Sequence, residues 1–185
     1  MTQKKVNFHP ATYGYHFANK FENHPFSPLP ITTFGLCGGM VMSALDYWRS
    51  SIPIPSHAPD DFGGTDVPPE GTGLQKYIFN RQVDSLFTKL SATRWIVFPW
   101  DHVPELYHKW CTEDEFQIVK QQIDKGRPAM LGLWTINNSP FGHQVLCYGY
   151  DTNPITLFLY DPNLPDEEAT LHPVSPKLAC EMRNA

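Results

Sequence analysis

The stretch FGLCGGM at residues 34–40 runs directly into an apolar helical pattern. Apolar side chains recur at helical spacing after it, as far as Trp48, which predicts a helix over about 38–50. Cys37 then lies where a loop becomes a helix, beside backbone N–H groups that have no partner within that helix. Because such groups stabilise a thiolate, we expect Cys37 to have a lowered pKa and raised nucleophilicity.

Length and composition bound the class of protein. The chain has 185 residues, enough for one full hydrophobic core and short for two, so we expect a single domain over 1–185. Hydrophobic residues make up 41% and charged residues 18%, which is typical of a folded domain. The net charge of −5, with no basic run, disfavours nucleic acid or an anionic membrane as a partner.

The N-terminal residues 1–7 carry two lysines but no apolar segment of the kind found in a secretory signal peptide. No apolar run in the sequence approaches the length of a membrane span. We therefore expect a cytoplasmic protein, or one exported by a route without a classical signal peptide.

The four cysteines show no CxxC spacing, which argues against a zinc knuckle or a thioredoxin-type motif. The chain is also large enough to fold without disulfides. We expect Cys111, Cys147 and Cys180 to be free thiols, and a disulfide between two of them is the alternative.

Three parts of the chain differ in pattern. Residues 1–36 are irregular and rich in aromatic side chains, which we expect to pack as an arm across the core. Residues 37–126 are predicted to be mainly helical and residues 127–185 mainly β. Helices followed by a small antiparallel sheet predict an α+β fold.

Two more helices are predicted in the helical part. The first covers about 74–90, with a buried stripe that includes Phe79 and Val83. The second begins at a capping-box pattern at Thr112 and ends at Gly126. Its expected buried side chains are Phe116, Val119 and Ile123.

A connection rich in proline and glycine, residues 51–73, separates the first two helices. Loops of this length in a compact domain are often functional. It is either a lid or substrate wall beside a cleft, or a passive surface excursion.

Runs rich in β-forming residues dominate the last third of the chain. The second and third of them are separated by a Thr-Asn-Pro turn, which predicts an antiparallel hairpin. The predicted strands, with a short one before the third helix, are 94–98, 129–135, 143–150, 155–160 and 169–174.

A nucleophilic cysteine needs an imidazole base and a polar group that orients it. His143 begins one strand of the predicted hairpin, and Asp161 follows the end of the next. Antiparallel neighbours bring the start of one strand beside the end of the other, so His143 and Asp161 are expected to be adjacent. Asn163 competes for the orienting role, and Asp161 is favoured because it ends its strand directly.

This arrangement resembles the papain-like cysteine peptidase superfamily, in which a cysteine at a helix N-terminus precedes a histidine on a strand and an Asn or Asp on the next. The segments GHQVLCYGYD (142–151) and YDPN (160–163) are most similar to the double-glycine-leader peptidases of bacteriocin exporters. The resemblance covers about residues 30–165. It implies a papain-like fold, with the helical part packed on a C-terminal antiparallel sheet, and a thiol protease with a Cys37-His143-Asp161 catalytic triad.

The chain departs from this family at one position. Papain-like enzymes carry a glutamine about six residues before the cysteine, where it helps to hold the oxyanion, and this chain has Ile31 there. Losing one oxyanion donor costs about 10²–10³ in rate. The backbone N–H of Cys37 can supply one donor, and two glycines after it would let a substrate backbone approach closely. The other oxyanion or pocket candidates are Thr32, Thr33, Gly38, Gly39 and Gln144.

We therefore expect a thiol hydrolase or acyl transferase that acts on an amide bond of a peptide, protein or small molecule. Peptidases, amidases, deamidases and transglutaminase-like effectors share an acyl-enzyme and differ in the acceptor, which is water or an amine. The alternative is a non-catalytic binding module that keeps the papain-like shell.

No cofactor is expected. A metal is the weaker option, because His57, His102 and His108 lie near carboxylates without matching a known metal motif. Asp46, inside the first helix, is expected to be solvated or salt-bridged rather than catalytic. The aromatic cluster at 95–110 is expected to pack in the core or under loops rather than to line a ligand groove.

Overall fold

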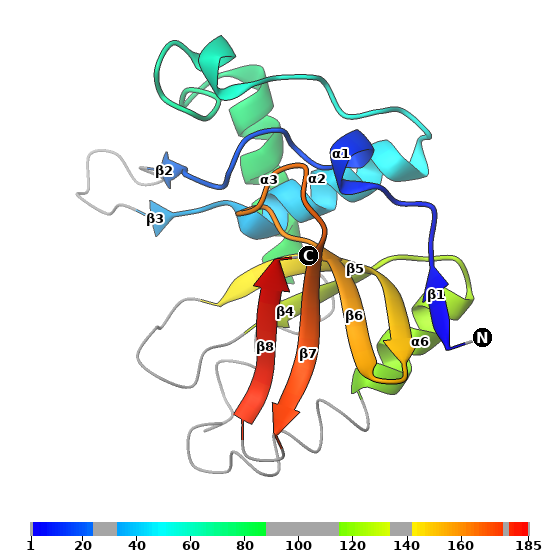
Figure 1. The fold of residues 1–185 in the computed structure, drawn as a ribbon. Coiled ribbons are helices and arrows are strands. Elements are labelled where there is room, and N and C mark those ends of the chain that lie inside the picture. The colour runs from blue at the N-terminus through cyan, green and yellow to red at the C-terminus, as the bar shows by residue number, and fades with distance from the viewer. Residues whose placement is uncertain (1, 24–32, 88–114, 134–141, 176–177, 185) are drawn as a thin grey trace.

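The computed structural model describes residues 2–23, 33–87, 115–133, 142–175 and 178–184. The strand predicted at 94–98, the aromatic cluster at 95–110 and the helix start at Thr112 lie outside the described residues. Within the described part, helices pack on an antiparallel sheet, so the α+β prediction is confirmed (Figure 1).

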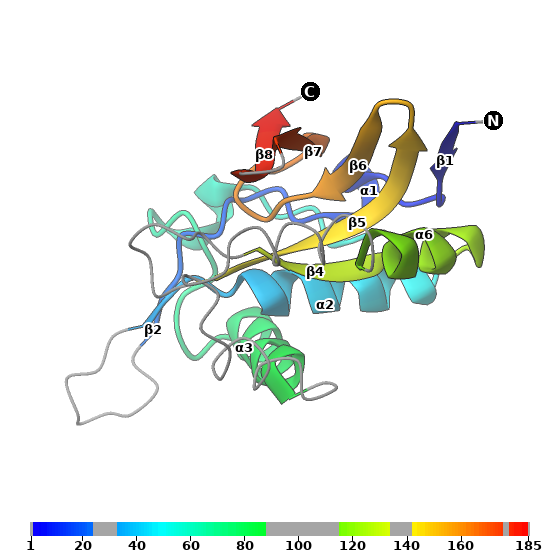
Figure 2. The same cartoon turned by 90° about the horizontal axis from the view of Figure 1, so that it is seen from below.

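The helical layer consists mainly of α2 (Cys37–Arg49) and α3 (Gly73–Phe87). Helix α2 begins one residue before the predicted range and contacts the sheet, whereas α3 lies on the far side of α2 (Figure 2). The buried stripe predicted for α3 is wrong at Val83, which is 38% exposed. The buried side chains of α3 include Gln75 and Ile78, and the backbone of Ile78 lies against Gly39 of α2, on a face that Val83 does not share.

Helix α6 (Phe116–Asp124) covers the opposite face of the sheet. All three of its predicted core residues are buried, and Gly126 follows its end with a φ of 72°, in the left-handed region that favours glycine. The alternation along the strands explains the two faces: Leu146 and Tyr148 pack toward α2, whereas Val145 and Cys147 pack toward α6.

Within the described residues, six strands form the main sheet, and their pairings are antiparallel. The strands are β1 (Gln3–Lys5), β4 (Ala129–Leu133), β5 (His143–Thr152), β6 (Ile155–Tyr160), β7 (Ala169–Ser175) and β8 (Leu178–Asn184). Their order is β1-β5-β6-β7-β8, and β4 pairs with β5 beside β1. The predicted β5–β6 hairpin is confirmed.

The N-terminal arm packs its rings into the core, as predicted. Phe8, Tyr15, Phe17 and Phe21 are all at most 2% exposed. The arm is more regular than expected, because it contains α1 (Pro10–Tyr13) and the strands β1, β2 (Glu22–Asn23) and β3 (Thr33–Phe34). Strand β1 escaped prediction because its three residues are all polar and exposed, so only backbone pairing with β5 defines it.

The connection 51–73 contains a short 3₁₀ helix, η1 (Pro59–Phe62). It packs on the N-terminal arm: Ile54 and Val67 are buried, and the Phe62 ring lies edge-on to the Phe17 ring at 5.2 Å. Figure 1 shows this connection at the end of the helical layer that is distant from the sheet. These contacts do not test whether the connection acts as a lid or substrate wall, so that role stays a prediction. No helix within the described residues has the length and apolar character needed to cross a membrane.

Candidate active site

Cys37 is the first residue of α2, at the end of the helical layer that meets β5. The backbone N–H of Gln144 donates a hydrogen bond to its sulfur at 3.4 Å. Burial raises the pKa of Cys37, but its hydrogen bond with His143 and the N–H groups of Gln144 and Gly38 outweigh burial and lower the pKa below its ordinary value. The lowered pKa agrees with the prediction, although an imidazole contributes more to it than the helix N-terminus does.

His143 is the first residue of β5, and its Nε2 lies 2.6 Å from Oδ1 of Asp161. Asp161 follows β6 and is fully buried. Burial lowers the pKa of His143, but the hydrogen bonds with Asp161 and Cys37 raise it overall to about 9. The predicted adjacency of His143 and Asp161 is thus confirmed, because the antiparallel pairing of β5 and β6 aligns the start of one strand with the end of the other.

Asn163 contacts both members of this pair. Its backbone N–H donates to Oδ1 of Asp161 at 2.8 Å, and its Nδ2 lies 3.4 Å from Nε2 of His143. Both Nδ2 and a protonated Nε2 are donors, so these two nitrogens cannot hydrogen-bond while Nε2 donates to Asp161. Asp161 is therefore the acceptor that Nε2 of His143 meets at 2.6 Å, and its orienting role stays a prediction.

The two glycines after Cys37 lie in close packing contacts, and their role in admitting a substrate backbone stays a prediction. A Cβ on Gly39 would lie 2.1 Å from the backbone oxygen of Ile78, so the backbones of α2 and α3 touch at this point. A Cβ on Gly38 would lie 2.2 Å from Oε1 of Gln144 and 2.4 Å from Oγ of Ser85. Both glycines are buried beneath neighbouring groups, so neither offers an open surface to a ligand.

Gln82 on α3 belongs to the same region and was not predicted. Its Oε1 accepts a hydrogen bond from the backbone N–H of Gly39 at 2.9 Å, which satisfies one of the unpaired donors at the start of α2. A polar residue inside a helix carries no sequence signal for such a contact. Of the other oxyanion candidates, Thr32 lies outside the described residues and Thr33 is described only by its backbone in β3.

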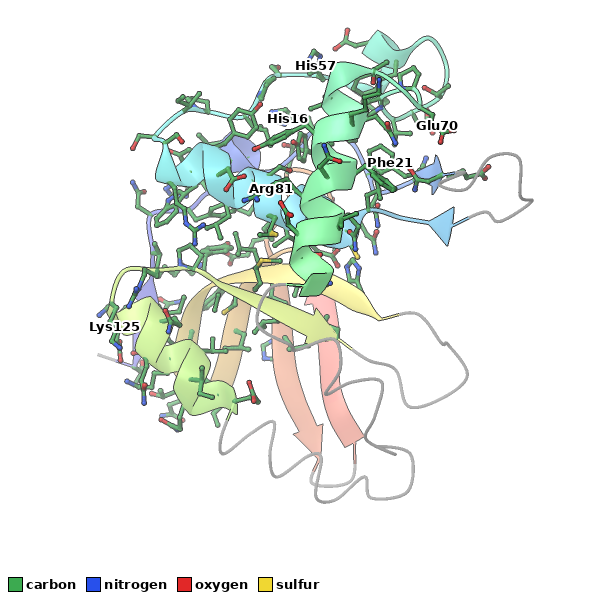
Figure 3. All side chains as sticks on the ribbon, turned by 180° about the vertical axis from the view of Figure 1, so that it is seen from behind. His16, Phe21, His57, Glu70, Arg81 and Lys125 are labelled. Atoms are coloured by element: carbon green, nitrogen blue, oxygen red, sulfur yellow. The ribbon has the colours of Figure 1, made fainter. Side chains whose placement is uncertain are left out.

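Cys147 is a fully buried free thiol, and burial raises its pKa to about 12. It contrasts with Cys37, which is also free but only partly buried. Cys111 and the side chain of Cys180 lie outside the described part of the chain. Asp46 is salt-bridged, as expected: Figure 3 shows Arg81 on α3, and its guanidinium lies 2.7 Å from the Asp46 carboxylate. Within the described ranges, no group of three His, Cys, Asp or Glu side chains is arranged to hold a metal.

No protein-family model matches this chain, and no curated protein or solved structure matches it either. What the site does is therefore inferred from its own geometry. That geometry joins a thiol of lowered pKa, an imidazole of raised pKa and a buried carboxylate, contributed by α2, β5 and the turn after β6.

Proposed function

We propose that this chain is a cysteine hydrolase or acyl transferase that acts on an amide bond of a peptide, a protein or a small molecule. The contact between Nε2 of His143 and the buried Asp161 carries the proposal. A buried carboxylate is costly unless it is paired, so Asp161 favours a protonated imidazole. Since Asp161 engages Nε2, the other ring nitrogen, Nδ1, is left to face the Cys37 thiol.

The charges of the two partners support a thiolate–imidazolium pair. The pKa of Cys37 lies below its ordinary value, and that of His143 is about 9. A lowered thiol pKa and a raised imidazole pKa both favour the state in which the sulfur is deprotonated and the imidazole is protonated. This state combines a strong nucleophile with an acid that is ready to protonate a leaving group.

In the proposed reaction, the Cys37 thiolate attacks the carbonyl carbon of the substrate, and a C–S bond forms while the carbonyl electrons move to oxygen. When the tetrahedral intermediate collapses, the C–N bond breaks and the leaving amine takes a proton from His143. Water or an acceptor amine then attacks the thioester and gives its proton to His143, which releases the acyl group and restores the thiolate. The backbone N–H of Cys37, in the first turn of α2, is the first candidate donor to the oxyanion.

We also propose that the domain has a papain-like fold. A helix that begins at the cysteine, followed by antiparallel strands that carry the histidine and the carboxylate, supports this assignment.

The test begins with thiol reactivity. Iodoacetamide should modify Cys37 first in the folded wild type, and the pH midpoint of its alkylation should lie below that of free cysteine, because His143 stabilises the thiolate. Peptide mass mapping locates the adduct, and the buried Cys147 is the internal control that stays unmodified. An alkylation midpoint at Cys37 equal to that of free cysteine would refute the ion pair.

Acyl transfer is tested with p-nitrophenyl acetate as an activated acyl donor. We expect a burst of p-nitrophenolate, a steady turnover phase and an acetyl adduct on Cys37. Cys37→Ser should fold normally and lose both the adduct and the turnover. Selective alkylation without any acyl turnover would favour the non-catalytic binding module, and undiminished turnover in Cys37→Ser would exclude Cys37 as the nucleophile.

A further inference from the structure

One residue of the N-terminal arm, Asn19, hydrogen-bonds to both loops that carry the proposed site. Its backbone N–H donates to the carbonyl oxygen of Pro162 at 2.9 Å. Its side-chain Oδ1 accepts from the backbone N–H of Leu36 at 2.6 Å. Pro162 directly follows Asp161, and Leu36 directly precedes Cys37. Asn19 therefore bridges the chain next to the orienting carboxylate and the chain next to the nucleophile.

We propose that Asn19 is a positioning residue, which holds the first turn of α2 at a fixed distance from the turn after β6 and so keeps Cys37 and Asp161 on either side of His143. The proposal rests on the proposed function of this site. Both of these hydrogen bonds join Asn19 to the backbone of the two loops, so it acts through that backbone.

The loop before Cys37 is shaped around the Asn19 side chain. Gly35 has a φ of 77°, in the left-handed region, and a Cβ at this position would lie 2.9 Å from Nδ2 of Asn19. The N–H of Gly35 also donates to the carbonyl oxygen of Phe21, at 2.9 Å. A glycine is therefore needed here both for its backbone conformation and for the close approach of the carboxamide. The loop and the arm form one hydrogen-bonded unit.

The arm that presents Asn19 is itself firmly anchored beside the carboxylate. Phe17 and Phe21 flank Asn19 in the chain and are buried in the core. The backbone N–H of Tyr15 donates to the hydroxyl of Tyr160 at 3.1 Å, and Tyr160 directly precedes Asp161. The arm thus hydrogen-bonds to the residues immediately before and after Asp161. It can therefore hold the loop before Cys37 at a fixed position relative to Asp161.

Rigid spacing matters because His143 must satisfy two partners at once. Its Nε2 lies 2.6 Å from Asp161, which leaves little room for the ring to follow a displaced loop. If the Leu36 N–H loses its acceptor, the first turn of α2 is free to shift, and the Cys37–His143 contact lengthens. A misplacement of about 1 Å can cost on the order of 10²-fold in rate.

The experiment compares Asn19→Leu, which keeps the approximate shape but removes the acceptor, with Asn19→Asp, which keeps an oxygen for the Leu36 N–H. The exposed Asn80 on α3 provides the matched control, Asn80→Leu. The first readout is the pH midpoint of Cys37 alkylation by iodoacetamide. We expect Asn19→Leu to raise this midpoint toward that of free cysteine and to slow alkylation near pH 6 by at least about tenfold. Asn19→Asp and Asn80→Leu should keep the wild-type profile.

If Asn19 only stabilises the fold, Asn19→Leu should lower the unfolding temperature but leave the pH midpoint of Cys37 alkylation unchanged in the folded protein. An unchanged midpoint in folded Asn19→Leu therefore overturns the proposal. If Asn19→Leu does not fold, Asn19→Ser is used, whose shorter side chain withdraws the acceptor from Leu36; an unchanged midpoint there refutes the proposal equally. The readout does not require turnover, so a wild type that shows the lowered midpoint but no acyl transfer refutes the proposed activity and still tests Asn19.

Discussion

Replacing Gly39 with alanine should destabilise the protein, although alanine is the better helix former. The added Cβ would lie 2.1 Å from the carbonyl oxygen of Ile78 and 3.0 Å from the backbone nitrogen of Gln82. Both atoms belong to the backbone of α3, so no change of rotamer relieves the clash. Ordinary contact begins at 3.4 Å, so α2 and α3 must separate by more than about 1 Å.

The magnitude follows from two opposing terms. Overpacking of a close contact costs about 1–3 kcal/mol, and more where backbone must move, whereas removal of a helical glycine returns up to about 1 kcal/mol. We therefore expect Gly39→Ala to lower the free energy of unfolding by about 2 kcal/mol. Gly73→Ala is the matched control, because a Cβ there meets nothing within 4 Å, and its effect should stay within about 0.5 kcal/mol.

Urea unfolding followed by tryptophan fluorescence and circular dichroism measures these differences. The midpoint should fall for Gly39→Ala with an unchanged m-value. Gly38→Ala should rank between the other two, because its Cβ would meet the side-chain ends of Gln144 and Ser85, which can rotate away. If Gly39→Ala is as stable as Gly73→Ala, the close approach of α2 and α3 is wrong, and the glycines after Cys37 regain a role in substrate access.

Three further outcomes are expected. Asp161→Ala should slow acyl transfer on the order of 10²-fold more than Asn163→Ala does, both variants being folded by circular dichroism, and the reverse ranking would assign the orienting role to Asn163. The pKa of His143 is raised from 6.5 to about 9 in the folded state, so the stability that this shift contributes is complete below pH 6.5 and disappears as the pH rises through about 9. In urea unfolding at several pH values, the difference in the free energy of unfolding between the wild type and Asp161→Asn should shrink across this range. A difference that stays constant with pH would contradict the pairing of His143 with Asp161. Tyr15→Phe should cost about 1 kcal/mol in urea unfolding, because it removes the buried hydroxyl that donates to Ser43, and no loss would show that this bond contributes nothing.

Local sequence patterns were sufficient for the elements whose signal lies in neighbouring residues. The periodicity after Cys37 predicted α2, the capped amphipathic run that ends at Gly126 predicted α6, and two apolar runs around an Asn-Pro turn predicted the β5–β6 hairpin. These patterns are readable because a buried face repeats with the period of its own helix or strand. The same reasoning predicted α3 and the packing of Phe79 against the core, and it was wrong only in placing the exposed Val83 on the buried face.

The sequence by itself placed Cys37 at the start of a helix and His143 and Asp161 at strand ends that antiparallel pairing brings together. Only the tertiary structure shows that Oδ1 of Asp161 lies 2.6 Å and Nδ2 of Asn163 lies 3.4 Å from Nε2 of His143, which supports the proposed choice of Asp161 as the orienting group. It was also needed to give the glycines after Cys37 a packing role and to reveal Asn19 as a bridge between the two loops. Those contacts join residues far apart in the chain. Their geometry depends on how whole helices and strands pack, and the periodicity of neighbouring residues does not predict that packing.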